Sequence, residues 1–352
     1  MPCKYTIVRK KCSFVQPRLR FRYIFVGLFL SVLTYKSGSL KFFATNRASH
    51  VDVQPQSKEY VAIMFHTDAD AFEQPLLNLE PLIDELWAVR LFNPIRKDDP
   101  SSTEKLHTTA LRVTQTQVAL SLQNKGVHLE VHGHDITDLP REALTNSFAL
   151  ANHFTLSLTT YDSIPEEKIL HIQQDVVFCH QHERSLVSFM HHKYVGAPWN
   201  SNLRTISLPD LNGNVLRLWY GNGGVSVRSK AFSQGCLRRV EYAADLNVSR
   251  YGAGLPEDVF FSRCLHEHHR HDIALEDASV FSAEEIIDAK KPTLAVHDPC
   301  RAANGPIVKN VSESVGCSTK EHIVTTKALL QRCPEAKRII FECVKDCASL
   351  LF

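Results

Sequence analysis

Two short apolar runs, YVAIMF at 60–65 and KILHI at 168–172, constrain the fold most, because each is typical of a buried strand. Polar side chains follow both runs directly. The intervening sequence shows further periodic segments: helices at 76–90, 103–124 and 141–160 and a strand at 127–131. Strands that alternate with helices predict an α/β fold with a mainly parallel sheet flanked by helices. Such sheets bind ligands at the carboxyl ends of their strands.

A basic segment and an apolar segment open the chain. Residues 1–22 hold seven of the 40 basic residues and no acid, and residues 23–35 are apolar and uncharged. The two segments predict a cytoplasmic head and a signal-anchor transmembrane segment, and a cleaved signal peptide is the alternative. The positive-inside rule then puts the remainder outside the cytosol. Thirteen apolar residues suit the thinner membrane of the early secretory pathway.

The polar residues 36–58 are expected to form a stem, and residues 59–352 a luminal domain. Residues 305–352 form a cysteine-containing C-terminal extension of that domain. Beyond the head the chain carries 33 basic and 38 acidic residues, which argues against nucleic acid as a partner. Eight cysteines outside the head are compatible with disulfides in an oxidising compartment. Asn247 and Asn310 begin glycosylation triplets.

Carboxylates follow both strong strands. Asp175 comes after 168–172, and Asp68 and Asp70 come after 60–65. Carboxylates at strand ends can bind Mg²⁺ or Mn²⁺, which prefer oxygen ligands, although acids there are also common as solvated turn residues. Asp175 is the stronger candidate, because its neighbours are uncharged and a partly desolvated carboxylate needs a partner.

Two further features could carry chemistry. Glu257 and Asp258 stand in the first turn of a helix predicted at 256–268, where acids complement the helix dipole or supply a general base. His297 follows a short apolar run and is a metal ligand only if a second ligand lies nearby. The histidine-rich segment 266–271 is interpreted as a solvated helix end, with a metal cluster as the alternative.

A glycine-rich segment, RLWYGNGGVSVRSK at 217–230, stands between an aromatic pair and an apolar run. Its glycines indicate either a hairpin turn or a backbone that another group approaches closely. Three aromatic residues in or before the segment either offer flat faces to a ligand or belong to the core: Trp199, Trp219 and Tyr220.

The order of these motifs resembles a known family. A strand that ends in Q-x-D, then YVGAPW at 194–199, GNGGVSVRS, PEDVFFS and a late histidine is similar to family 5672 of domains of unknown function, which is grouped with the GT-A glycosyltransferases. The similarity runs from about residue 60 to 300. EDVFFSRCL also resembles the ED-V motif of the β-1,3-glycosyltransferases.

The resemblance implies a GT-A-like fold and roles for particular residues. Gln173 and Asp175 stand where these enzymes carry D-x-D, the site of the metal and the nucleotide-sugar, although the first acid is here a glutamine. Asp175 and His297 would hold Mn²⁺ or Mg²⁺. Asp258, beside Glu257, stands at the position of the base.

The same resemblance assigns the glycine-rich segment to the substrate. Gly223 and Gly224 would form a floor beneath the donor sugar, with Asn222 and the three aromatic residues facing the substrate.

The sequence therefore predicts a hexosyltransferase-type glycosyltransferase of the secretory pathway, a single-pass type II protein of the Golgi or ER membrane. It would transfer a sugar from a nucleotide-sugar to a hydroxyl of a glycan or protein acceptor, with inversion if Asp258 is the base; a retaining mechanism stays open. The alternatives are a catalytically inactive GT-A-like scaffold that binds carbohydrate or nucleotide-sugar, and a hydrolase that pairs Asp175 with Asp258.

Overall fold

A computed structural model describes residues 58–199, 206–250, 254–283, 293–297, 327 and 329–337. These residues belong to one unit of the chain, which spans 39–352. The predicted head and anchor, nearly all of the stem, and Asn310 lie outside the described residues. No helix within the described ranges has both the length and the apolar character needed to cross a membrane.

The main sheet has six strands in the order β3-β2-β1-β4-β9-β6. Every neighbouring pair is parallel except β4 with β9 and β9 with β6, so β9 alone runs against the other five strands. The mainly parallel α/β sheet expected from the sequence is confirmed. The bounds of these strands are β1 Tyr60–Phe65, β2 Trp87–Ile95, β3 His128–Asp135, β4 Lys168–Ile172, β6 Tyr194–Pro198 and β9 Tyr220–Ser229.

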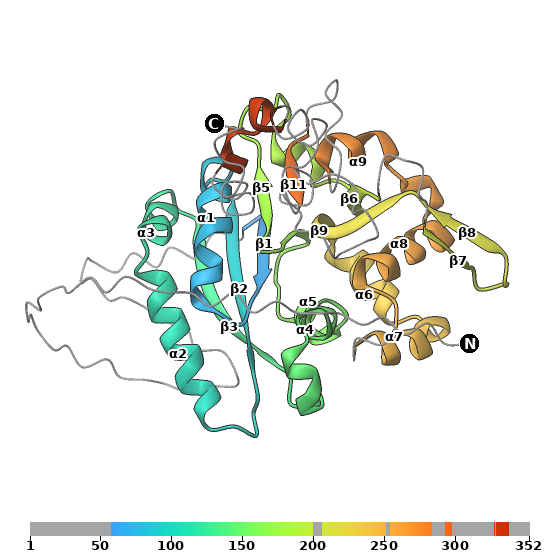
Figure 1. The fold of residues 1–352 in the computed structure, drawn as a ribbon, viewed down its shortest axis with the longest axis horizontal. Helices are drawn as coiled ribbons and strands as arrows, with labels where there is room; N and C mark the ends of the chain where they lie inside the picture. Colours follow the sequence, from blue (N-terminus) through green and yellow to red (C-terminus); the bar gives the residue numbers. More distant parts are fainter. Residues whose placement is uncertain are drawn as a thin grey trace, which may run out of the picture. The chain divides into compact units, whose positions relative to one another are not determined.

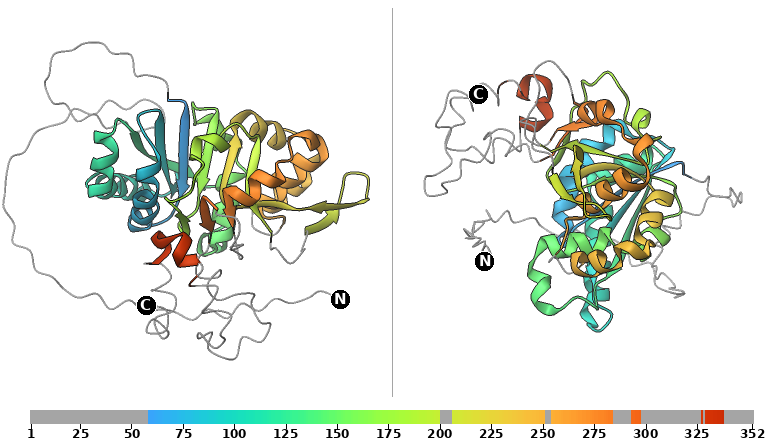
Figure 2. Two further views of the ribbon diagram at one scale, coloured as in Figure 1. Left: turned by 90° about the horizontal axis from the view of Figure 1, so that it is seen from above. Right: turned by 90° about the vertical axis from the view of Figure 1, so that its right-hand side faces the viewer.

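Two smaller sheets and a set of helices accompany the main sheet in the described structure. One small sheet joins β10 (Ser282–Ala283), β11 (Ala295–His297) and β5 (Val176–Phe178), and the other is a hairpin of β7 (Ile206–Pro209) and β8 (Val215–Leu218) that projects at one side (Figure 1, Figure 2). The helices are α1 Glu73–Leu79, α2 Ser101–Thr114, α3 Gln117–Asn124, α4 Ser147–Thr155, α5 Leu158–Asp162, α6 Lys230–Leu237, α7 Ala243–Arg250, α8 Glu257–His268 and α9 Leu275–Phe281.

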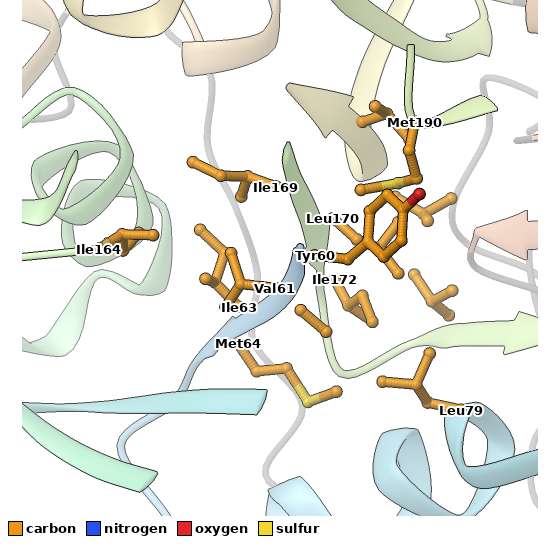
Figure 3. Close-up of a cluster of buried hydrophobic side chains, with 14 of the residues drawn as sticks. Tyr60, Val61, Ile63, Met64, Leu79, Ile164, Ile169, Leu170, Ile172 and Met190 are labelled. Carbon is orange, nitrogen blue, oxygen red and sulfur yellow. The ribbon is translucent and has the colours of Figure 1, made fainter. Parts of the chain in front are cut away.

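The helices divide between the two halves of the main sheet. Helices α2 and α3 pack beside β2 and β3, whereas α6, α8 and α9 gather around β9 and β6 (Figure 1). The hydrophobic core lies between the main sheet and the helices that pack on it. Apolar side chains of β1 and β4 fill its centre together with residues from α1 and the segment before β6 (Figure 3).

The expected helix 76–90 is wrong in its second half. Pro81 lies in a 3-10 helix, Glu80–Leu82, that closes α1, and Ile83 is extended. Proline lacks the N–H that a continuing helix would need, so the chain turns at Asp84 and Trp87 opens the central strand β2.

The other long predicted helices are interrupted by local caps. Within 103–124 the Thr116 hydroxyl accepts a hydrogen bond from the Ala119 N–H and begins α3 as a separate helix. Within 141–160 the Asn146 side chain caps α4 in the same way, after a 3-10 helix at Arg141–Thr145.

Two disulfides link segments that are distant in the sequence. Cys179, directly after β5, is bonded to Cys333 of the C-terminal extension, and Cys236 of α6 is bonded to Cys264 of α8. The first bond ties part of the extension to the small sheet, and the second fixes α8 to its neighbour. Paired cysteines of this kind are typical of oxidising compartments.

Candidate active site

The carboxyl ends of β1 and β4 form the topological switch point of the main sheet. The chain proceeds from β1 to β2 and β3 on one side, and β4 lies on the other side of β1. Met64 pairs with Ile172 in the β1–β4 register, so the segments that follow the two strands leave the sheet at the same level. Ligands of open α/β sheets bind in the crevice at such a point. The turn Gln173–Asp175 occupies it, and Asp175 is half-buried.

His66, the first residue after β1, lies at the same edge. Its ring contacts the Gln174 side chain, and its Nδ1 accepts a hydrogen bond from the Asp68 N–H at 2.9 Å. Burial lowers the pKa of His66, although the contacts with Asp68 and Gln174 oppose the shift, and the ring is therefore neutral at physiological pH. The sequence analysis missed His66. Its place directly after a strong strand was the signal that could have identified it.

The small sheet brings the backbone of His297 close to Asp175. Strand β11 runs antiparallel to β5, and in this register His297 pairs with Val176, the residue after Asp175. The two predicted metal ligands, 122 residues apart in the sequence, thus have neighbouring backbones, with Asp175 directly before β5 and His297 at the end of β11. Carboxylate oxygens and imidazole nitrogens are both ligand types that divalent metal ions take.

The glycine-rich segment is part of strand β9, so the hairpin-turn interpretation is wrong. In the pairing of β6 with β9, Gly196 pairs with Ser226 whereas Ala197 pairs with Asn222, which leaves an irregular bulge of β9 at 223–225. The carbonyl of Gly224 accepts a hydrogen bond from the Gln173 N–H at 2.8 Å. The Gly223 N–H donates to Asp258 Oδ2 at 3.3 Å. Two successive residues of the bulge therefore contact the Gln173 turn and Asp258.

Helix α8 explains why two of these positions are glycine. A Cβ atom on Gly223 would overlap the Glu257 carboxylate and lie 3.0 Å from Asp258 Cβ. Gly221 has φ +131°, and a Cβ there would overlap the Ser262 hydroxyl. The missing side chains of Gly221 and Gly223 thus allow α8 to pack closely against β9. In the Cβ direction of Gly223, the neighbouring groups are thus side chains of Glu257 and Asp258, and the role of Gly223 and Gly224 beneath a donor sugar stays a prediction.

The two acids at the start of α8 have different surroundings. Glu257 is buried, and its Oε1 accepts a hydrogen bond from the fully buried Arg228 at 3.0 Å. Asp258 is half-buried, with Oδ1 held by the Val259 N–H at 2.7 Å and Oδ2 by the Gly223 N–H. Glu257 is therefore a structural ion-pair partner, and Asp258 is the acid that a substrate could approach.

Asn152 of α4 positions the start of α8. The N-cap residue of α8, Pro256, has no side chain that could accept a capping hydrogen bond, and Asn152 Oδ1 instead accepts one from the Glu257 N–H at 3.1 Å. The amide nitrogen of Asn152 donates to the carbonyl of Ser249 at 2.9 Å. The residue is 1% exposed. Nothing in the local sequence indicates this role, because it depends on contacts about 100 residues away.

The residues predicted to face the substrate differ in how far they are exposed to solvent. Trp219 is 43% exposed, and Trp199 is half-buried against the β7–β8 hairpin. Tyr220 is fully buried and its hydroxyl accepts a hydrogen bond from the Ala274 N–H, so the expectation that it presents a face to a sugar is wrong. Asn222 is also buried, and its Oδ1 accepts from the Gly224 N–H. Asn222 thus stabilises the bulge itself.

The other titratable groups singled out in the sequence have local partners. Asp68 caps the 3-10 helix Ala69–Phe72, and Asp70 forms an ion pair with Arg112. Segment 266–271 closes α8 and gathers no metal group. Among the described residues, the group that brings three potential metal ligands together is His191, His192 and Asp277.

Residues 134–297 match the family model described as "Protein of unknown function (DUF5672)". This segment is a domain of that family, which confirms the family resemblance of the motifs. The matched range includes the Gln173 turn, the glycine bulge, the start of α8 and His297. A comparison with curated protein sequences gives no match.

Two solved structures are similar to the chain at low identity. Apo mouse xyloside xylosyltransferase 1 has a TM-score of 0.37 and 12% identity, over 72% of this chain and 100% of that chain. The apo glycosyltransferase GlyE of Streptococcus pneumoniae TIGR4 has a TM-score of 0.40 and 13% identity, over 82% of this chain and 64% of that chain. TM-scores this low carry no inference about the fold or activity of this chain.

Proposed function

We propose that this protein is a glycosyltransferase with a GT-A-like site, which transfers a sugar from a nucleotide-sugar donor to a hydroxyl acceptor. One observation carries the proposal. In the bulge of β9, the Gly224 carbonyl accepts a hydrogen bond from the Gln173 N–H, and the Gly223 N–H donates one to Asp258 Oδ2. One short backbone segment therefore contacts both the switch-point turn and a partly accessible carboxylate, which supports a site where two bound substrates are held together.

The donor would bind at the Gln173 turn. Asp175 and His297 would hold Mn²⁺ or Mg²⁺, and the bound ion would supply positive charge to the departing diphosphate. His66 and Gln174 are neutral polar groups at the same edge that can hydrogen-bond the donor.

The acceptor would bind beside Asp258. Its carboxylate is oriented by two backbone N–H groups, and it would take the proton of the attacking hydroxyl. The exposed Trp219 offers a flat face for a sugar ring. Direct attack of this kind inverts the anomeric carbon.

A second candidate function is a protein that binds nucleotide-sugar without turnover. Gln173 favours it, because a glutamine replaces the first acid of D-x-D and leaves one carboxylate for the metal. The same groups would bind the donor in both cases.

We further propose that the domain lies in the lumen of the ER or Golgi behind a type II anchor. Two disulfides and the basic head before an apolar run support this orientation. Protease digestion of sealed microsomes tests it. Digestion of the domain without detergent would show the opposite orientation, and soluble protein that begins near residue 38 would show a cleaved signal.

The test of function is a panel of nucleotide-sugars, with and without Mn²⁺, assayed for donor binding and for slow donor hydrolysis. A transferase hydrolyses one donor slowly, and Asp258→Asn lowers that kcat by about 10²–10⁴-fold. Donor affinity stays unchanged, because the base acts only in the transition state. Binding without hydrolysis identifies the non-catalytic protein. No binding of any donor refutes both functions.

A further inference from the structure

A cluster of three potential metal ligands shares no residue with the proposed sugar-transfer site. His191 and His192 follow the 3-10 helix Leu186–Phe189, and Asp277 is on α9, which packs against β6. One potential ligand atom from each residue lies within 4.8 Å of the others. The imidazole rings of His191 and His192 lie close together, tilted by 41° with centroids 3.9 Å apart.

Neighbouring groups orient all three side chains. His191 Nδ1 lies 2.9 Å from the carbonyl oxygen of Ser188, which fixes Nδ1 as the donor and leaves Nε2 as a lone-pair nitrogen. His192 Nε2 lies 2.7 Å from Asp277 Oδ2. Arg184 donates to the other carboxylate oxygen, Asp277 Oδ1, at 2.6 Å. Metal-binding histidines commonly donate their second ring N–H to a backbone carbonyl, and metal-binding carboxylates are themselves hydrogen-bonded.

We propose that His191, His192 and Asp277 bind a divalent transition-metal ion, with Zn²⁺ as the best fit. Two imidazoles and one carboxylate are ligands that Zn²⁺ takes readily, and the exposed side of His191 leaves room for water as a further ligand. The ion would fasten α9 to the segment that leads into β6. This site does not depend on the proposed sugar transfer.

The test uses the full chain, stripped with a chelator and then titrated with Zn²⁺ by calorimetry, with thermal denaturation measured in parallel. The parent protein should bind at least one Zn²⁺ ion per chain, and Zn²⁺ should raise its Tm. His191→Gln should weaken binding at this site by about tenfold or more, because a ligand is lost. Since His191 is exposed, the metal-free Tm of this variant should match that of the parent.

His271→Gln is the matched control, because His271 is an exposed histidine 3.1 Å from a carboxylate oxygen of Asp272 but outside any three-ligand group of the described residues. It should bind Zn²⁺ as the parent does. Asp175→Asn distinguishes Zn²⁺ binding at this site from metal binding at the proposed donor site. Zn²⁺ binding at His191, His192 and Asp277 should be unchanged in this variant. Equal Zn²⁺ affinity in His191→Gln and the parent, or no Zn²⁺ binding by the parent, would overturn the proposal.

Discussion

The two sides of the proposed site are built differently. At the carboxyl edge of the parallel strands, the Gln173–Asp175 turn is half-buried or exposed, and His66 contacts it through a side chain. At the junction of α8 with β9, a buried ion pair, the Asn152 amide and a disulfide fix the helix. Substitutions at the carboxyl edge should therefore change the free energy of unfolding little. At the junction of α8 with β9, the contacts that stabilise the fold also position Asp258.

The largest expected effect separates the two adjacent acids at the junction. Glu257→Gln leaves the fully buried Arg228 without its charged partner, which should lower the free energy of unfolding by about 3–5 kcal/mol. Asp258→Asn should cost less than about 1 kcal/mol, because its carboxylate is partly exposed. Denaturant unfolding of both variants measures the difference. Equal losses would mean that Asp258 is as much a structural acid as Glu257.

The glycine bulge gives the next largest effect. Gly223→Ala places a Cβ against the Glu257 carboxylate and should destabilise the protein by about 1–3 kcal/mol. Gly235→Ala on α6 is the control, since no atom lies within 4 Å of its Cβ position, and alanine there should be neutral or stabilising by about 0.5–1 kcal/mol. A Gly223→Ala protein as stable as the parent would show that α8 does not need this close approach.

The third effect concerns how the stability of the fold depends on pH through a buried histidine near the carboxyl edge of the sheet. His134, at the end of β3, is buried with its Nε2 3.0 Å from His153 Nδ1, and burial followed by the charge of His153 lowers its pKa to about 3. Below pH 6.5 the unfolded chain therefore binds one proton that the folded chain does not, and stability falls as the pH falls.

Between pH 7.5 and pH 5, this single group should lower the free energy of unfolding by about 2 kcal/mol. His134→Gln removes the group, so the variant should lose about that much less than the parent over the same range. Denaturant unfolding at both pH values measures it. Parallel losses in the two proteins would contradict the low pKa of His134.

The smallest effect is expected in the switch-point turn. Gln174 is exposed, and Gln174→Ala should change the free energy of unfolding by less than about 0.5 kcal/mol. Thermal denaturation is sufficient to check this. A loss comparable with that of Glu257→Gln would remove the distinction between the edge and the junction.

The sequence predicts the edge better than the junction. The strands at 60–65 and 168–172 follow from local apolar runs, and the structure places both as expected. The glycine segment misleads because glycine is uncommon within strands, and its partner helix begins more than 30 residues later. Arg228 likewise has no local pattern that pairs it with Glu257.

The metal pair shows the same limit. The family resemblance pairs Asp175 with His297, but no local pattern does so, and the pairing of β5 with β11 is what brings their backbones together. Strand pairing across such a separation depends on the whole fold. Local periodicity also fails to predict β2. The apolar spacing fits a helix over 76–90, but the helical structure ends after Pro81, and β2 begins at Trp87.

The most direct test of the central claim is equilibrium binding of the nucleotide-sugar that the panel selects, measured with the parent and with Asp175→Asn, each with and without Mn²⁺. The parent should bind tightly only with Mn²⁺. Asp175→Asn should lose about tenfold or more of that affinity while its Tm stays within a few degrees of the parent's. Binding that is independent of Mn²⁺ and equal in the two proteins would contradict a metal-assisted donor site at the switch point.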